Sequence, residues 1–105
     1  MKLDAVAFGA HPDDVELTCA GTLIKMVRKG YRIGIVSLTA GEISTRGDCR
    51  LRRAEFERAA AIIGVAEAAV LNLPDGKLAG LWEQKREVIH AIRRYRPKIV
   101  FAPYW

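Results

Sequence analysis

One imidazole and three carboxylates lie within six residues of each other, in the segment 9–16 with the sequence GAHPDDVE. Imidazole nitrogen and carboxylate oxygen are ligands of a catalytic zinc ion, which takes three protein ligands and keeps a fourth position for water. The metal lowers the pKa of that water toward about 7. A neighbouring carboxylate can then accept its proton. The adjacent Asp13 and Asp14 can therefore divide the roles of ligand and general base.

A buried strand and an amphipathic helix are predicted on either side of this segment. Residues 5–8 are uniformly apolar, and apolar side chains recur at helical spacing over residues 13–28. Pro12 fixes its own φ and suits the first position of a helix, so it stiffens the chain that carries His11. Acids in a first helical turn also serve as caps. A histidine and three acids together at a strand end nevertheless favour a site.

The rest of the chain alternates strands with helices. We predict strands over 31–38, 68–73 and 99–102, and helices over 49–63 and 81–95. The order β-α-β-α-β-α-β indicates right-handed βαβ units. The expected fold class is therefore α/β, a Rossmann-like three-layer fold with a mostly parallel sheet. We expect residues 1–105 to form one domain.

The four predicted strands are followed by residues 9–14, 39–47, 74–77 and 103–105, and every strong polar cluster of the chain lies in one of these segments. In sheets of this class, ligands bind beyond the carboxyl ends of the strands. We therefore expect a ligand site at this edge of the sheet.

The motif at residues 10–16, AHPDDVE, resembles the (A/P)-H-P-D-D-x-E motif of the LmbE-like (PIG-L) deacetylases. The further matching segments are Gly21-Thr22, Thr39-Ala40-Gly41-Glu42, Arg46-Gly47, Arg52-Arg53-Ala54-Glu55, Ile63-Gly64-Val65 and Leu73-Pro74-Asp75-Gly76. The resemblance covers nearly the whole chain in the right order. Within the family, the sequence looks most like the bacillithiol-pathway enzymes, which deacetylate N-acetylglucosaminyl-malate.

This resemblance implies a zinc-dependent N-deacetylase that hydrolyses an amide with zinc-activated water. One Zn²⁺ per site is the implied cofactor, although another divalent metal would serve. His11 and Asp14 match the first two zinc ligands, and Asp13 matches the general base. Glu16 matches a glutamate that supports the turn.

The resemblance also implies four substrate-binding residues. Arg52 matches an arginine near the sugar or its anionic substituent, and the neighbouring Arg53 is the alternative. Asp75 matches a carboxylate that holds sugar hydroxyls, but it could equally be a turn former. Glu42 and Arg46 lie in a loop after a strand and are expected to line the pocket.

The third zinc ligand of the family is a histidine in an H-x-x-H-type segment that would follow residues 102–105. The other histidine of this chain, His90, lies in the middle of a predicted helix and is interpreted as a packing or surface residue. We therefore expect these 105 residues to be the N-terminal part of a longer deacetylase domain, inactive when isolated.

Composition narrows the classes of partner. The net charge of +5 could indicate nucleic acid, but the basic residues alternate with acids on two predicted helices, which is typical of solvated faces. No apolar stretch is long enough for a membrane span, and the two cysteines show no disulfide framework. We therefore expect a cytoplasmic protein with a small-molecule N-acetylglucosaminyl substrate, without nucleic acid or membrane partners and homo-oligomeric at full length.

Two other functional classes remain at this point. A nucleotide-binding α/β module would need G-x-G-x-x-G in the first strand-to-helix turn, where this chain has a histidine and acids that repel phosphate. A non-catalytic fragment that serves only in assembly is the other alternative.

Overall fold

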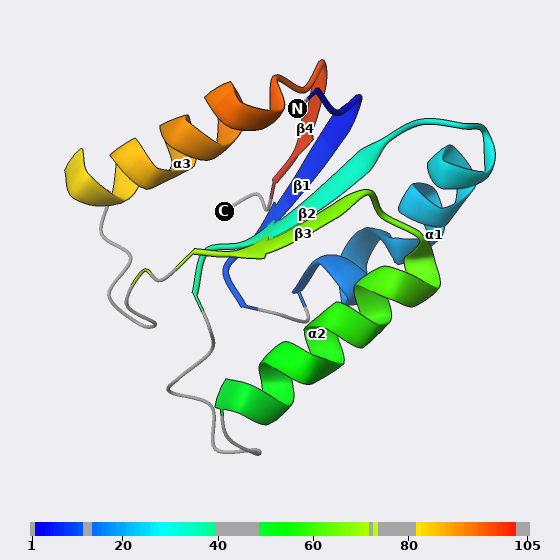
Figure 1. The fold of residues 1–105 in the computed structure, drawn as a ribbon, viewed down its shortest axis with the longest axis horizontal. Helices are drawn as coiled ribbons and strands as arrows, with labels where there is room; N and C mark the ends of the chain where they lie inside the picture. The colour runs from blue at the N-terminus through cyan, green and yellow to red at the C-terminus, as the bar shows by residue number, and fades with distance from the viewer. Residues whose placement is uncertain (1, 12–13, 40–48, 72, 74–81, 103–105) are drawn as a thin grey trace.

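The computed structural model describes residues 2–11, 14–39, 49–71, 73 and 82–102. Within them, four strands alternate with three helices (Figure 1). The elements are β1 (Ala5–Gly9), α1 (Asp14–Arg28), β2 (Ile33–Ser37), α2 (Cys49–Ile63), β3 (Glu67–Val70), α3 (Trp82–Tyr95) and β4 (Ile99–Phe101). This confirms the predicted α/β class and the order of its elements.

The four strands form one sheet with the order β3-β2-β1-β4, and every pair is parallel. Ala5 of β1 is in register with Ile33 of β2 on one side and with Ile99 of β4 on the other. The chain therefore proceeds from β1 in one direction to β2 and β3, and reaches β4 on the opposite side. Such a reversal is the switch point at which α/β sheets bind ligands.

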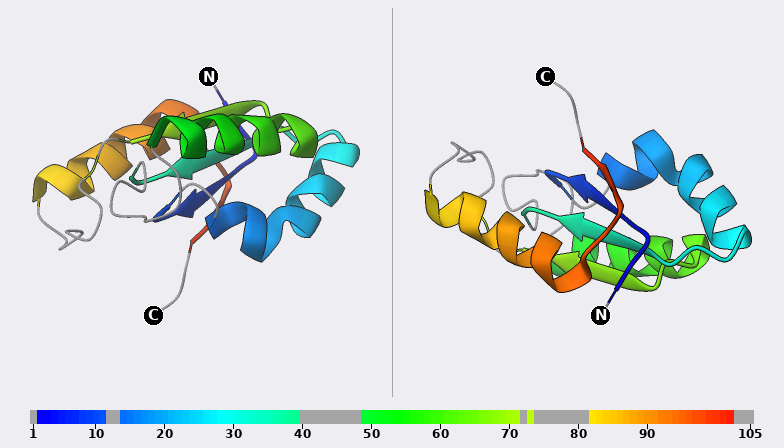
Figure 2. Two further views of the ribbon diagram at one scale, coloured as in Figure 1. Left: turned by 90° about the horizontal axis from the view of Figure 1, so that it is seen from below. Right: turned by 90° about the horizontal axis from the view of Figure 1, so that it is seen from above.

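Helices cover both faces of the sheet and give three layers (Figures 1 and 2). Side chains of a strand alternate between the two faces. Ala5 and Ala7 of β1 pack with residues of α1 and α2. Val6 and Phe8 pack with Ala91 and Tyr95 of α3. Because β1 and β2 are buried on both faces, their sequences are almost entirely free of polar residues, with Ser37 at the end of β2 as the exception.

The predicted second strand begins too early in the sequence. We expected a strand over residues 31–38, whereas β2 begins at Ile33. Gly30 ends α1 with a φ of +92°, and the N–H of Tyr31 donates to the Met26 carbonyl oxygen at 3.1 Å. These bonds form a helix-terminating turn that occupies the residues before Ile33.

The third strand is also shorter than the predicted range of 68–73, because β3 spans Glu67–Val70. Beyond the end of β3, the chain continues to form hydrogen bonds with the last residue of β2 and with the residue that follows it. The N–H groups of Leu71 and Leu73 donate to the carbonyl oxygens of Ser37 and Leu38, at 2.8 and 3.1 Å. The chain after β3 thus stays beside the segment that leaves β2 at the carboxyl-end edge of the sheet.

Helix α1 is bent. Cys19 has φ −138° and ψ 16°, which are not helical values, and two helical segments meet there. The hydroxyl of Thr18 donates to the Asp14 carbonyl oxygen at 2.7 Å. A side-chain bond of this kind to the preceding turn bends helices. The first segment of α1, which begins at Asp14, therefore has its own direction.

Candidate active site

The described part of the site lies where β1 passes into α1. His11 follows the end of β1 by two residues, and Asp14 is the first residue of α1. Their side chains are 42% and 37% exposed. Both can therefore be reached by a ligand from solvent.

Two backbone-directed hydrogen bonds join His11 and Asp14. The N–H of His11 donates to Oδ2 of Asp14 at 3.0 Å, and the N–H of Asp14 donates to the His11 carbonyl oxygen at 3.1 Å. A carboxylate that reaches back to the N–H three residues earlier is one half of a capping box. The helix start therefore orients the carboxylate of Asp14 toward His11.

The two side chains are also spaced as a ligand pair would be. Nδ1 of His11 lies 3.6 Å from Oδ2 of Asp14. Two ligand atoms bound to one tetrahedral zinc, with bonds near 2.1 Å, lie about 3.4 Å apart. The separation of these two atoms is therefore close to that of two ligand atoms on one zinc ion. In the described part of the chain, no group of three His, Cys, Asp or Glu side chains lies within reach of one metal ion.

Gly9 allows α1 to approach the end of β1. A Cβ atom at Gly9 would lie 2.9 Å from Cβ of Asp14 and 3.2 Å from Cγ2 of Val15. Because Cβ of Asp14 is bonded directly to the helix backbone, the helix itself would have to move. The position of Asp14 thus depends on a missing side chain at residue 9.

A series of hydrogen bonds from buried residues fixes the backbone of Ala10, the residue before His11. The hydroxyl of Thr39 donates to the Ala10 carbonyl oxygen at 2.7 Å, and the N–H of Thr39 donates to the same oxygen at 3.1 Å. The hydroxyl of Ser37 in turn donates to the Thr39 carbonyl oxygen at 2.7 Å. Neither residue was assigned a role from the sequence. The available signal was a serine at the end of an otherwise apolar strand and a threonine two residues after it.

Arg52 lies in the first turn of α2, and this helix begins at the end of the sheet to which the strands point (Figure 1). It is partly buried, whereas Arg53 is exposed. Nε of Arg53 lies 3.6 Å from Oε1 of Glu57 in an exposed pair one helical turn apart. Arg53 therefore faces solvent, and Arg52 is the more buried of the two arginines.

The other predicted site residues cannot be placed. Asp13, Glu42, Arg46 and Asp75 lie outside the described residues. Glu16 lies in α1, but its side chain is not described. Their assigned roles stay predictions.

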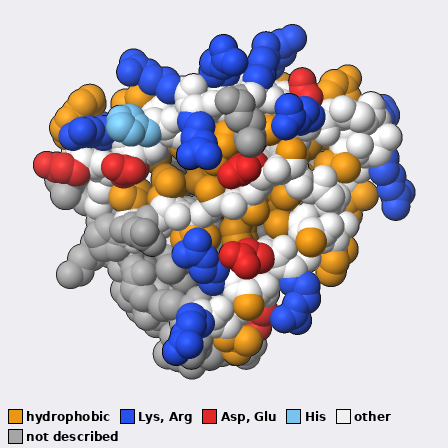
Figure 3. All heavy atoms as spheres, in the orientation of Figure 1, with side chains coloured by type: hydrophobic (Ala, Val, Ile, Leu, Met, Phe, Trp, Pro, Cys, Tyr) orange, Lys and Arg blue, Asp and Glu red, His pale blue; other side chains and the backbone are white. Residues whose placement is uncertain are grey.

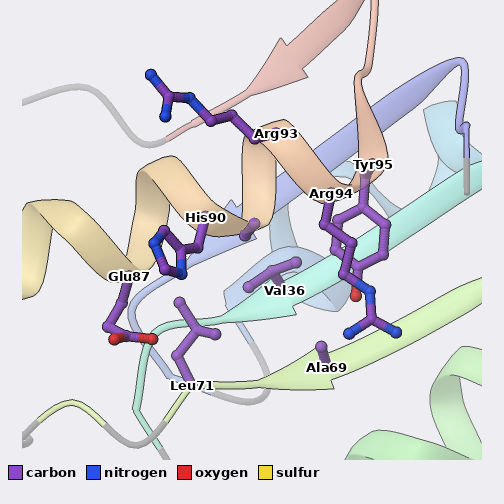
Figure 4. A pocket seen from close by; sticks show the side chains of 9 residues that line it. Val36, Ala69, Leu71, Glu87, His90, Arg93, Arg94 and Tyr95 are labelled. Carbon is purple, nitrogen blue, oxygen red and sulfur yellow. The ribbon is translucent and has the colours of Figure 1, made fainter.

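A hollow on the other face of the sheet is separate from this site (Figure 4). Its apolar floor is formed by Val36, Ala69 and Leu71, and α3 forms its wall with Glu87 and His90. His90 is exposed there, on the face opposite α1. The structure thus places His90 at the surface, as expected from the sequence, and away from His11.

Tyr95 belongs to the wall of the same hollow, and the residue as a whole is 4% exposed. Burial raises the pKa of its phenol above the usual value, and the neighbouring Glu67 carboxylate raises this pKa further. The hydroxyl donates to Oε1 of Glu67 at 3.4 Å. Tyr95 is therefore a structural group held in its neutral form.

The surface charges and the lengths of the helices are relevant to the predictions about nucleic-acid and membrane partners. The face drawn in Figure 3 mixes Lys and Arg side chains with Asp and Glu. This mixture matches the interleaving of charges in the sequence. Among the helices that the structure describes, none has the length and apolar content needed to cross a membrane.

Comparison with known proteins identifies the family. Residues 6–105 match the family model described as PIG-L, GlcNAc-PI de-N-acetylase. The chain therefore belongs to the PIG-L family, as its motifs predicted.

Individual relatives agree with this assignment. The diacetylchitobiose deacetylase of Thermococcus kodakarensis is 34% identical over 100 residues, which cover 89% of this chain and 38% of that protein. Among solved structures, the conserved protein TT1542 from Thermus thermophilus is 41% identical with a TM-score of 0.92, over 97% of this chain and 46% of that one. The N,N'-diacetylchitobiose deacetylase from Pyrococcus horikoshii is 28% identical with a TM-score of 0.87, over 94% and 40%. The chain thus spans less than half the length of these relatives.

Proposed function

We propose that this chain is the N-terminal part of a metal-dependent hydrolase that removes the acetyl group from an N-acetylglucosaminyl conjugate. The observation that carries the proposal is the 3.6 Å separation between Nδ1 of His11 and Oδ2 of Asp14 at the switch point of the sheet. Family membership and the deacetylase names of two relatives support it.

His11 and Asp14 would hold the metal ion, with a third ligand supplied by a segment that follows these 105 residues. Bound Zn²⁺, or another divalent metal, supplies Lewis acidity that makes water a nucleophile near neutral pH. Asp13 accepts the proton of the attacking water and later delivers a proton to the amine nitrogen. The water oxygen bonds to the acetyl carbon and the C–N bond breaks, so the products are acetate and a free amine. Glu16 would support the turn.

The substrate side of the pocket is assigned to Arg52, Asp75, Glu42 and Arg46. A guanidinium group matches the geometry of a carboxylate and binds it through two hydrogen bonds. We therefore propose that Arg52 binds an anionic aglycone such as malate, as the resemblance to bacillithiol-pathway enzymes implies. Asp75 would hold sugar hydroxyls. The two relatives named as diacetylchitobiose deacetylases make a neutral N-acetylated disaccharide the competing substrate class.

The organisation of the whole protein is part of the same proposal. Residues 1–105 would belong to one longer deacetylase domain, which forms a homo-oligomer in the cytoplasm. A nucleotide-binding module is disfavoured because the turn after β1 presents His11 and Asp14, not glycine N–H groups, at the position where phosphate would bind.

The test is acetate release by the purified full-length protein, with and without prior removal of metal by a chelator. N-acetylglucosaminyl-malate and diacetylchitobiose are offered separately. We expect turnover of the malate conjugate, its loss on chelation, and its recovery with Zn²⁺. Turnover of diacetylchitobiose but not of the malate conjugate would support the deacetylase reaction and contradict the proposed malate aglycone. Absence of acetate release from both, in zinc-loaded protein, would overturn the proposed function.

A further inference from the structure

The peptide unit between Ala10 and His11 is hydrogen-bonded at both ends, and the proposed chemistry does not use it. Its carbonyl oxygen accepts two hydrogen bonds from Thr39, from Oγ1 at 2.7 Å and from the backbone N–H at 3.1 Å. Its N–H donates to Oδ2 of Asp14 at 3.0 Å. The two ends of one peptide unit are thus held by residues that follow two different strands.

A peptide unit is planar, so its C=O and N–H cannot turn independently of each other. The direction of the Ala10 carbonyl therefore also sets the direction of the His11 N–H. That N–H binds the carboxylate oxygen which lies 3.6 Å from Nδ1 of His11. A change at the Thr39 end would turn the donor away from Asp14 at the other end.

We propose that Thr39 is a positioning residue for the metal-binding pair, acting through the peptide unit between Ala10 and His11. This inference rests on the proposed function. Thr39 is fully buried, and its carbonyl oxygen accepts the hydroxyl of Ser37, which is also buried. Ser37, Thr39, the peptide unit and Asp14 form a continuous hydrogen-bonded chain from β2 to the start of α1. Such chains orient metal ligands, and their loss typically weakens metal affinity.

The hydroxyl of Thr39 can be removed without a change of shape. Thr39→Val keeps the branched side chain and the backbone N–H bond, but loses the 2.7 Å bond to Ala10. Thr39→Ser keeps the hydroxyl and loses only the methyl group. Thr22→Val is the control, because it makes the same substitution at an exposed threonine of α1 that lies outside this hydrogen-bonded chain.

Zinc affinity is measured in the full-length protein by competition with a chelator, together with kcat, KM and the thermal midpoint. We expect Thr39→Val to bind zinc about 10- to 100-fold more weakly. With zinc saturating, its kcat should fall while KM changes little. Thr39→Ser should stay within a few-fold of the unaltered protein in zinc affinity, and Thr22→Val should bind zinc as the unaltered protein does.

An unaltered zinc affinity and kcat in Thr39→Val, with only a lower thermal midpoint, would overturn the inference and leave Thr39 a structural residue. If Thr39→Val does not fold, Ser37→Ala replaces it, and we expect zinc binding several-fold weaker. Unaltered zinc binding in that variant would overturn the inference equally. Failure of the proposed function would show differently, because the unaltered protein would then neither bind zinc nor release acetate.

Discussion

His11 and Asp14 hold each other at the start of α1. The N–H of each residue donates to an oxygen of the other, at 3.0 and 3.1 Å, and the imidazole nitrogen Nδ1 lies 3.6 Å from the same carboxylate oxygen. The helix start and the predicted metal site thus use the same atoms. Capping alone would satisfy the hydrogen bonds, but it does not require an imidazole beside the carboxylate.

Replacement of Asp13 by asparagine should remove most turnover and leave the metal bound, because Asp13 is assigned as the base and not as a ligand. General-base catalysis contributes about 10²- to 10⁴-fold. The measurements are kcat and the metal content of the purified full-length variant. Asp14→Asn is the matched comparison and should lose metal. If instead Asp13→Asn loses stoichiometric metal, the two aspartates have exchanged roles.

Gly9→Ala should destabilise the protein by about 1–3 kcal/mol, as expected for overpacking. The added Cβ would lie 2.9 Å from Cβ of Asp14, so α1 must shift. Urea denaturation of the full-length protein measures the effect. Gly21→Ala is the control, because a Cβ there meets no atom within 4 Å. In an exposed helix it should stabilise by about 0.5–1 kcal/mol. Equal stabilities of the two variants would contradict the close approach.

Arg52→Ala should raise KM for a malate-bearing substrate more than KM for a methyl glycoside. The reason is that the variant lacks the guanidinium group, which would form two charge-assisted hydrogen bonds with the substrate carboxylate. Arg53→Ala is the internal control, since Arg53 forms an exposed pair with Glu57. Such pairs contribute little. Equal losses for both substrates would make Arg52 a scaffold residue.

Alkaline pH should weaken the fold through Tyr95. Burial, assisted by Glu67, raises the pKa of its phenol in the folded protein above the ordinary value of 10.0. The corresponding stability is fully present below that value and is lost as the pH rises through the folded-state pKa. Thermal midpoints between about pH 9 and 11 should fall less steeply for Tyr95→Phe than for the unaltered protein. Absorbance titration of the phenols checks the direction, and identical slopes would refute it.

The isolated 1–105 chain should release no measurable acetate and bind zinc far more weakly than the full-length protein. A hydrolytic zinc site takes three protein ligands, and only His11 and Asp14 are assigned here. Calorimetric zinc titration and an acetate assay on the purified fragment measure both quantities. Tight one-to-one zinc binding with multiple turnovers would show that a third ligand lies within these residues.

The fold was predictable because its signals are local. Apolar runs mark β1 and β2, and Gly30 and Gly64 follow the helices they end. The boundary of β2 was wrong because hydrophobicity does not reveal the hydrogen-bonded turn at Gly30.

The candidate site was predictable only in part. His11 and Asp14 are three residues apart, so a motif contains both. The bond from Thr39 to Ala10 spans 29 residues, and only the pairing of β1 with β2 brings its ends together. Asp13, Glu42, Arg46 and Asp75 lie outside the described residues and stay predictions.

The strand order has a consequence for the folding pathway. β1 meets β2 after a single helical crossover, but it meets β4 only when Ala5 pairs with Ile99, across almost the entire sequence. Closing so long a loop costs entropy that nearer contacts do not require. We therefore expect β1, β2 and β3 to pair before β4 joins them. Substitutions in β4, such as Val100→Ala, would accelerate unfolding while leaving the folding rate almost unchanged.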